Sequence, residues 1–279
     1  MRRVLPVLAG MLVLLGACSS EGGGTPFGIV ASSPGSIGVG EQRVMFALIN
    51  QETNEYLASP DHTATVTLRD ENGAPIETYP TEFMWTVEDV RGLYVAQMVI
   101  PEAATYQVTI DAEGFTTAGP MGLVAVDDPS VIRAGDSAPL SETRVSADYP
   151  DLGLITSDPD PDPAMYQLSV AEAVTGGNPV VIVFATPGFC ASATCGPLLD
   201  QVKSLRESYP GVDFIHVEIY EDLQVTDQSK LTLVAAVGEW GLPSEPWVFV
   251  VDSSGAVTAS FEGAARDEEL NSAIEAVAP

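Results

Sequence analysis

The sequence predicts two domains, an all-β sandwich followed by an α/β domain with a mixed central sheet and helices on both faces. Three observations lead to this prediction. The chain has 279 residues, which is enough for two separate hydrophobic cores. Between residues 36 and 127, short alternating apolar runs are separated by turn residues, without a convincing helical period. From residue 164 to the end, apolar β-branched runs alternate with segments of helical period.

The first domain is predicted over residues 36–127 as an immunoglobulin-like sandwich, because its apolar runs recur at the spacing typical of such strands. The expected strands are Arg43–Asn50, Thr63–Asp70, Glu82–Val87, Gly92–Ile100, Thr105–Ala112 and Gly122–Val126. The Asn-Gly pair at residues 72 and 73 is typical of a hairpin turn, since both residues accept positive φ. His62 is interpreted as an exposed bystander, and Tyr94 and Tyr106 as core residues, so we expect no chemistry in this domain.

Residues 128–163 are predicted to form a solvated linker, because they are rich in Asp, Pro and Ser. The repeat Asp158–Pro163 (DPDPDP) carries three carboxylates, which suggests a calcium site as the alternative. Prolines between the carboxylates favour an extended chain, and no glycine allows a loop to wrap around an ion. The linker interpretation is therefore preferred.

The second domain is predicted over residues 164–279. Its expected strands are Tyr166–Leu168, Val180–Phe184, Val212–Ile219, Trp247–Val251 and Val257–Phe261. Its expected helices are Ser169–Val174, Gly196–Tyr209, Asp227–Val237 and Asp267–Val277. Since the last two strands form a hairpin, the sheet is expected to be mixed.

A cysteine pair follows the central strand of this domain. Cys190 and Cys195 are five positions apart, and within one regular helix that spacing puts them roughly 8 Å apart on opposite sides. If the two bond, Cys190 must therefore lie in the loop and the helix must begin near Cys195. Pro197 suits a first helical turn, and Thr194 is a suitable N-cap. The helix N-terminus then points at Cys195 and its neighbour, which favours a thiolate.

The simplest alternative for the pair is a structural disulfide. Closing so short a loop stabilises the fold by only roughly 2 kcal/mol, against about 3 kcal/mol for a fifteen-residue loop. A redox or thiol-exchange role is therefore preferred, and metal binding is a third possibility.

The N-terminal residues predict an exported protein. Residues 1–18 start with two arginines and an apolar run too short to span a membrane comfortably. Leu-Gly-Ala-Cys, ending at Cys18, resembles the bacterial lipobox, in which the cysteine is lipidated. Residues 19–35 are then a flexible tether. An ordinary secretory signal is the alternative, and either way the mature protein is extracytoplasmic, where a disulfide persists.

The charge of the chain limits its partners. It has 39 acidic and 11 basic residues, and its formal net charge is −28 at pH 7. Such a surface repels nucleic acid and anionic membranes. We expect contact with a membrane only through the N-terminal lipid.

Residues 135–279 resemble the thioredoxin superfamily in three segments. Phe184–Cys190 (FATPGFC) resembles the approach to the active site in membrane-anchored thiol-disulfide oxidoreductases. Gly241–Trp247 (GLPSEPW) resembles the segment with the cis-proline that faces the cysteines, and Phe261–Gly263 resembles the closing glycine. The strand order predicted above is also that of the family. The resemblance implies a thioredoxin-like fold, with Gly135–Pro139 as its lead-in.

The resemblance also implies roles, although the family's Cys-x-x-Cys is replaced here by cysteines with four residues between them. By position Cys190 is the attacking thiol and Cys195 the resolving one. The roles are reversed if Cys-Gly-Pro at Cys195 matches the Cys-Gly-Pro of thioredoxins. The residue before the predicted cis-proline, Pro246, is Glu245, whose charge would raise the pKa of a nearby thiol. A sluggish, rather reducing dithiol is therefore expected.

The candidate residues for proton transfer lie on the strand Val212–Ile219, which follows the helix after the cysteines. Phe214, His216, Glu218 and Tyr220 share one face by their period of two. His216 falls about where thioredoxins have a buried lysine, which would suit a proton relay. A core histidine that is hydrogen-bonded to Glu218 is the preferred alternative.

Two other activities are less well supported. Copper-delivering thioredoxin-like lipoproteins use two cysteines and a later histidine, and no histidine follows His216 here. The Pro-x-x-x-Thr-x-x-Cys pattern of peroxiredoxins is absent as well. The sequence therefore predicts a lipid-anchored extracytoplasmic thiol-disulfide oxidoreductase, with protein thiols or disulfides as partners and no cofactor or metal. The alternative is a binding or scaffolding lipoprotein in which the disulfide is structural and the sandwich holds the partner.

Overall fold

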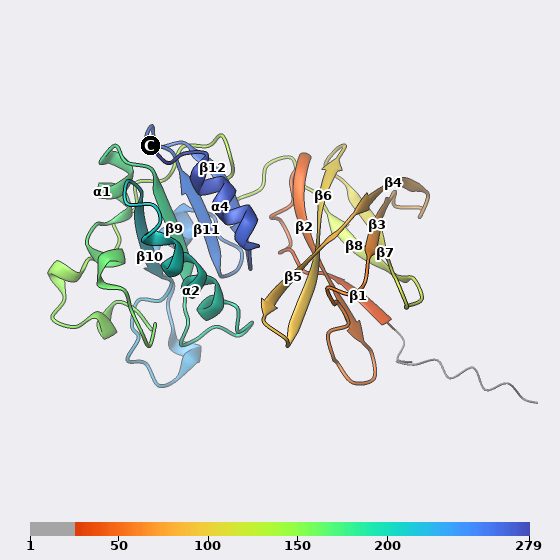
Figure 1. Ribbon diagram of the computed structural model, residues 1–279, viewed down its shortest axis with the longest axis horizontal. Helices are drawn as coiled ribbons and strands as arrows, with labels where there is room; N and C mark the ends of the chain where they lie inside the picture. The colour runs from red at the N-terminus through yellow and green to blue at the C-terminus, as the bar shows by residue number, and fades with distance from the viewer. Residues whose placement is uncertain (1–25) are drawn as a thin grey trace, which may run out of the picture.

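The computed structural model describes residues 26–279 as two bodies that lie side by side along the long axis (Figure 1). The predicted signal peptide, the lipidated Cys18 and the first part of the tether lie outside the described residues. In the part of the chain from residue 26 onward, no helix is both long and apolar enough to cross a membrane.

The first body is a sandwich of two four-stranded antiparallel sheets, ordered β1-β2-β6-β5 and β4-β3-β7-β8. Its strands are β1 (Pro26–Val30), β2 (Gly40–Asn50), β3 (Ala64–Arg69), β4 (Pro75–Pro80), β5 (Glu82–Val87), β6 (Arg91–Ile100), β7 (Thr105–Ala112) and β8 (Ala118–Val124). The alternating apolar residues of both sheets meet in one core, which includes Tyr94 and Tyr106 as predicted. His62 is less exposed than expected, because its ring packs edge-on against Phe115.

Two strands of the sandwich were not predicted. β1 lies in the expected tether and pairs with β2, and Gly28 in it faces Met121 so closely that a Cβ would lie 2.6 Å from the sulfur. β4 follows the predicted Asn-Gly turn and pairs with β3. Both strands escaped prediction because their apolar alternation is weak: on β4 only Tyr79 is buried.

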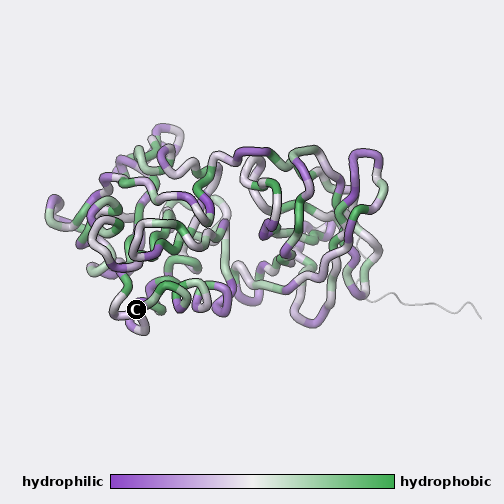
Figure 2. Tube along the Cα trace, turned by 90° about the horizontal axis from the view of Figure 1, so that it is seen from above, coloured by the Kyte–Doolittle hydropathy of each residue, from purple (hydrophilic) through white to green (hydrophobic). Residues whose placement is uncertain are grey.

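The second body contains a mixed sheet in the order β10-β9-β11-β12. Its elements are α1 (Val170–Thr175), β9 (Val180–Ala185), α2 (Cys195–Arg206), β10 (Asp213–Glu218), α3 (Ala235–Glu239), β11 (Trp247–Val251), β12 (Val257–Glu262) and α4 (Asp267–Glu275). β10 is parallel to β9, and β11 is antiparallel to both of its neighbours. Helices α1 and α3 contribute to the core on one face of the sheet, and α2 and α4 to the core on the other. Figure 2 shows hydrophobic segments mainly toward the inside of both bodies and hydrophilic segments mainly on their outer loops.

Two elements differ from the prediction. Residues 166–168 are not a strand: the chain forms a 3-10 helix over Pro163–Tyr166, which turns the buried Tyr166 into the core. The predicted helix Asp227–Val237 is instead a 3-10 turn at Gln228–Lys230 followed by the short α3. Its Ser, Lys and Thr residues do not provide a continuous apolar stripe, so only the C-terminal part packs on the sheet.

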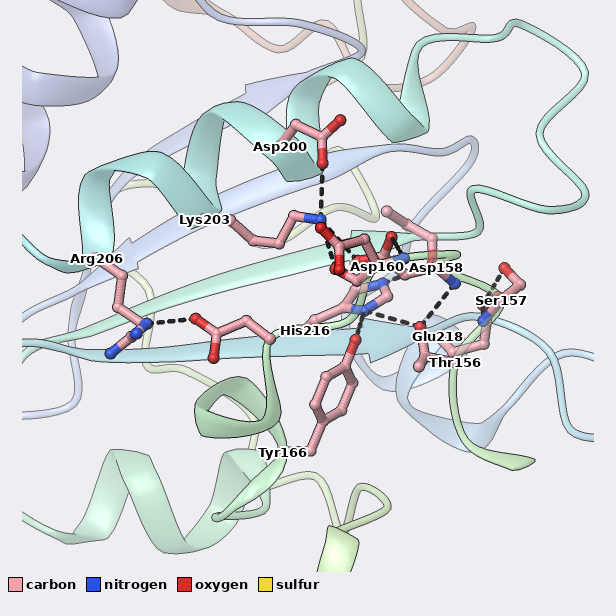
Figure 3. Close-up of polar contacts among 12 residues, drawn as sticks. Thr156, Ser157, Asp158, Asp160, Tyr166, Asp200, Lys203, Arg206, His216 and Glu218 are labelled. Carbon is pink, nitrogen blue, oxygen red and sulfur yellow. Dashed lines mark hydrogen bonds and ion pairs between the residues drawn. The ribbon is translucent and has the colours of Figure 1, made fainter. Parts of the chain in front are cut away.

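The prediction that residues 128–163 form a solvated linker is wrong. Val131, Ala138 and Ile155 are buried in the two cores of the second body. Two of the three DPDPDP carboxylates, those of Asp158 and Asp162, are paired with Lys203 and Arg206 of α2 (Figure 3). This segment is therefore an integral part of the second body.

The outer face of the β1-β2-β6-β5 sheet packs on the second body. Met45 and Leu93 of the sandwich share a buried cluster with Ala264, which precedes α4. Beside this cluster, Arg43 donates two hydrogen bonds of 3.0 Å to the carboxylate of Glu269 and one of 3.1 Å to the carbonyl of Ala264. The contact brings one sandwich face against the end of the sheet where the cysteines lie.

Candidate redox site

The cysteine loop lies between the fully buried β9 and the start of α2. After β9 the chain turns back through a hydrogen bond from the Phe189 N–H to the Thr186 carbonyl at 3.1 Å. The helix begins at Cys195, with Thr194 at the N-cap position as expected, although the Thr194 side chain makes no capping hydrogen bond. Cys190 therefore lies in the loop and Cys195 in the first helical turn.

A disulfide joins Cys190 to Cys195, whose Cα atoms are 6.1 Å apart. Cys195 is fully buried, whereas Cys190 is partly exposed. The Cys195 N–H donates to the Cys190 sulfur at 3.4 Å, and the Ser192 hydroxyl lies 3.2 Å from the same sulfur. The positive end of α2 therefore faces Cys190, and both donors stabilise negative charge on that sulfur once the bond is reduced.

The segment with Glu245 and Pro246 lies beside the loop. The Glu245–Pro246 peptide is cis, Pro246 is buried, and its carbonyl accepts a hydrogen bond from the Gly263 N–H at 2.8 Å. Burial raises the pKa of the half-buried Glu245. Glu245 lines one pocket together with Ser192 and Thr194, but among residues 26–279 no hydrogen bond joins it to either cysteine.

His216 is buried on β10, next to the C-terminal end of the neighbouring strand β9 (Figure 3). Its Nε2 is 3.1 Å from the carbonyl oxygen of Ala185, and its Nδ1 is 2.7 Å from the hydroxyl of Tyr166. A carbonyl only accepts, so Nε2 carries the proton and Nδ1 accepts from the tyrosine. Burial lowers the pKa of His216 to about 4. The expected pairing with Glu218 is wrong, because no hydrogen bond joins the two among the described residues.

Glu218 instead binds, through Ser157, the backbone segment that leads to the cysteines. Its carboxylate accepts from the Ser157 N–H at 2.8 Å and from the Ser157 hydroxyl at 2.5 Å. That hydroxyl in turn accepts from the Gly188 N–H at 3.0 Å, two residues before Cys190. Burial raises the pKa of Glu218, and the hydrogen bonds from Ser157 partly offset the rise.

Sequence reasoning missed the Ser157–Glu218 contact because Ser157 lies in the segment interpreted as a linker. The only signal was the position of Glu218, two residues after His216 at the end of a buried strand. Gly188 completes the arrangement, since a Cβ there would lie 2.9 Å from the Ser157 Cβ. The three residues fix the backbone that leads into the cysteine loop.

The structure also bears on metal binding, the third possibility for the cysteine pair. Over residues 26–279, no group of three or more His, Cys, Asp or Glu side chains is arranged to hold a metal ion. The site consists of a disulfide, a helix N-terminus and a proline loop, a combination suited to exchange of thiols and disulfides.

Comparison with known proteins gives likenesses to parts of the chain. No family model matches it, and no curated protein matches it. Similar solved structures include MTB dsbF in its mixed oxidized and reduced forms, with 21% identity, 38% of this chain and 85% of that chain covered, and a TM-score of 0.31. A thioredoxin-family thiol:disulfide interchange protein from Chlorobium tepidum TLS has 15% identity, coverage of 38% and 83%, and a TM-score of 0.30. The Lin-41 filamin domain has 10% identity, coverage of 36% and 93%, and a TM-score of 0.24.

Proposed function

We propose that the protein is a thiol-disulfide oxidoreductase of the thioredoxin-like type, anchored by a lipid at Cys18 on the extracytoplasmic face of the membrane and carrying an immunoglobulin-like sandwich. One observation carries the proposal. Cys190 is partly exposed and its sulfur accepts the first N–H of α2, while its partner Cys195 is fully buried. This asymmetry suits one attacking and one resolving thiol.

The reaction has two exchange steps. In the reduced protein, the Cys190 thiolate attacks one sulfur of a partner disulfide, which forms a mixed disulfide and releases the other partner sulfur as a thiolate. The Cys195 thiolate then attacks the Cys190 sulfur, which closes the Cys190–Cys195 bond and releases the partner's second thiolate. The two electrons pass from the cysteine pair to the partner, and the reverse sequence oxidises a partner dithiol.

The surroundings of the loop support Cys190 as the attacking residue. A thiolate at Cys190 keeps both donors, the Cys195 N–H and the Ser192 hydroxyl. A thiolate at the fully buried Cys195 is exposed to no solvent, so it forms favourably only when it has a mixed disulfide to attack. The reversed assignment is therefore not adopted.

The second candidate is a binding lipoprotein with a structural disulfide. One contact favours it: the guanidinium of Arg91, from the sandwich, donates to the Ser192 carbonyl and so holds the cysteine loop. In this case the pair never exchanges, and the partner binds to the sandwich.

Trapping distinguishes the two candidates. Reduced Cys195→Ser protein is expected to accumulate a mixed disulfide with a disulfide-bonded test protein, because the resolving thiol is missing. Cys190→Ser is the matched control, and it should trap far less, since its remaining thiol is buried. If neither variant forms an adduct and the wild-type chain does not accelerate exchange, the pair is structural.

A further inference from the structure

The sandwich reaches the cysteine loop through one side chain. Arg91, the first residue of β6, donates to the carbonyl of Ser192, midway between the two cysteines. Its guanidinium also lies over the ring of Tyr56, 5.0 Å from the centroid. The Ser192 hydroxyl is 3.2 Å from the Cys190 sulfur and 2.7 Å from the Thr194 hydroxyl. The interface between the two bodies, here called the seam, therefore reaches the cysteine loop.

A pocket of about 300 Å³ opens along this seam. Its sandwich wall is mostly apolar and comes from β1, β2 and β6, with Ile29, Ala47 and Leu93 among its residues. The opposite wall contains Thr194 of the cysteine loop and Glu245, the residue before the cis-proline. This volume is at the small end for a ligand site, which suits a side chain of a docked polypeptide better than a separate small molecule.

An exposed apolar strip leads into the pocket. Phe27 and Ile29 alternate on the outer face of β1, where 47% and 38% of their surfaces are exposed, and Ile29 belongs to the pocket wall. β1 is one of the two edge strands of its sheet. Two exposed apolar side chains on this edge strand therefore lie beside the apolar wall of the pocket.

The charges at the seam restrict what can bind there. Glu245 and Glu262 contribute carboxyl groups to the pocket, and Arg91 is already engaged by Tyr56 and Ser192. The whole chain carries a net charge of −28. These charges repel an acidic segment, and the preference for an apolar side chain comes from the mostly apolar wall of the pocket.

We propose that the sandwich forms part of the substrate site: its β1-β2-β6 face receives an apolar side chain from an extended partner segment whose cysteine reacts with Cys190. The inference rests on the proposed exchange activity and names its substrate class. The attack on the partner cysteine then occurs with the adjoining side chain against Ile29 and Leu93.

Exchange rates with short peptides test this inference. The probes are cysteine peptides with glycine, leucine or glutamate on both sides, each joined as a mixed disulfide to an aromatic thiol that absorbs when released. The reduced full-length chain attacks the peptide sulfur, so release of the aromatic thiolate reports the first exchange step. We expect the leucine peptide to react about tenfold faster than the glycine peptide, and the glutamate peptide to be the slowest.

Ile29→Glu should remove the preference for leucine, measured as the ratio of the leucine-peptide rate to the glycine-peptide rate in the same variant. Ile76→Glu is the matched control, because Ile76 is also an exposed isoleucine, on β4 in the other sheet, with 46% of its surface exposed against 38% for Ile29. Ile29→Ala adds no charge, so it controls for misfolding caused by the glutamate of Ile29→Glu. It should reduce the preference for leucine in part.

The outcomes separate the two proposals. Reaction at equal rates with all three peptides would overturn the substrate site but leave the exchange activity intact. A preference that survives both Ile29 variants would overturn it as well. No reaction with any disulfide would overturn the proposed function, and the substrate site with it.

Discussion

Cys190 and Cys195 share one disulfide, but their sulfurs have different surroundings. Cys190 is partly exposed and has two hydrogen-bond donors, the Cys195 N–H and the Ser192 hydroxyl. Cys195 is fully buried in the core formed with α2 and α4. After reduction, negative charge is therefore better stabilised on Cys190, which is also the sulfur that a partner can reach.

Alkylation of the reduced protein tests this asymmetry. Cys190 is expected to react with iodoacetamide at least about tenfold faster than Cys195 near neutral pH, because only the thiolate reacts and only Cys190 is accessible. Peptide mass analysis after a timed quench measures both rates in one sample. Equal rates, or faster modification of Cys195, would reverse the assigned roles.

His216 is a second residue whose surroundings fix its behaviour. Burial lowers its pKa from 6.5 to about 4, and both ring nitrogens are engaged, by Ala185 and Tyr166. A group whose pKa falls on folding takes up a proton more readily in the unfolded chain. The stability it contributes is complete above pH 6.5 and is lost as the pH falls from 6.5 toward 4.

The pH dependence of unfolding tests this account of His216. Between pH 8 and pH 5, the wild-type free energy of unfolding should fall by about 2 kcal/mol more than that of His216→Gln. Urea denaturation at the two pH values measures the difference. His62→Gln is the matched control, because it makes the same substitution at the other histidine of the chain. Equal pH dependence in wild type and His216→Gln would contradict the neutral, buried assignment.

At the scale of elements, α2 has two functions. Its N-terminus faces the Cys190 sulfur, and its C-terminal half holds the DPDPDP segment (Figure 3). Lys203 donates to Asp158 at 2.9 Å, and 15% and 5% of these side chains are exposed. Arg206 donates to Asp162 at 2.6 Å. Because Ser157 and Glu218 adjoin this segment, the ion pairs help to fix the backbone that precedes the cysteines.

Lys203→Met should lower the free energy of unfolding by about 2 kcal/mol, because it leaves the nearly buried Asp158 without its cation. Lys230→Met is the control: Lys230 pairs with Asp227 on the surface, with 73% and 53% of the side chains exposed, and should cost less than about 0.5 kcal/mol. Urea denaturation at constant pH compares the two. Similar losses for both variants would show that the α2 ion pair has no special role.

The bounds of the elements also show which parts of the fold the local sequence predicts. The strands β5, β7 and β11 have the predicted bounds, and α2 begins at Cys195, because alternation, helical period and the position of Pro197 are local signals. β1 and the segment around Ile155 were missed, because their burial depends on distant partners. The same limit applies to the site: the cysteine pair is evident in the sequence, whereas the Ser157–Glu218 contact and the sandwich wall arise only from tertiary packing.

At the scale of the whole molecule, the two bodies pack against each other. The bidentate contact between Arg43 and Glu269 has little exposed surface, at 13% and 11% of the side chains. Burial raises the pKa of Glu269, but the hydrogen bonds and charges of Arg43 and Arg266 together outweigh this, and the pKa is lowered overall. The contact therefore stabilises the arrangement above the ordinary pKa of a glutamate and weakens as the pH falls below it. At neutral pH the sandwich stays against the cysteine loop, where its apolar face completes the proposed substrate site.

The equilibrium reduction potential of the Cys190–Cys195 pair is the most direct test of the central claim. The full chain is equilibrated in graded dithiol buffers, its thiols are alkylated, and the oxidised fraction is read by mass. We expect a reversible transition between about −120 and −270 mV, toward the reducing end of that range because Glu245 lies beside the loop. A pair that remains oxidised below about −300 mV would be a structural disulfide and would contradict the claim.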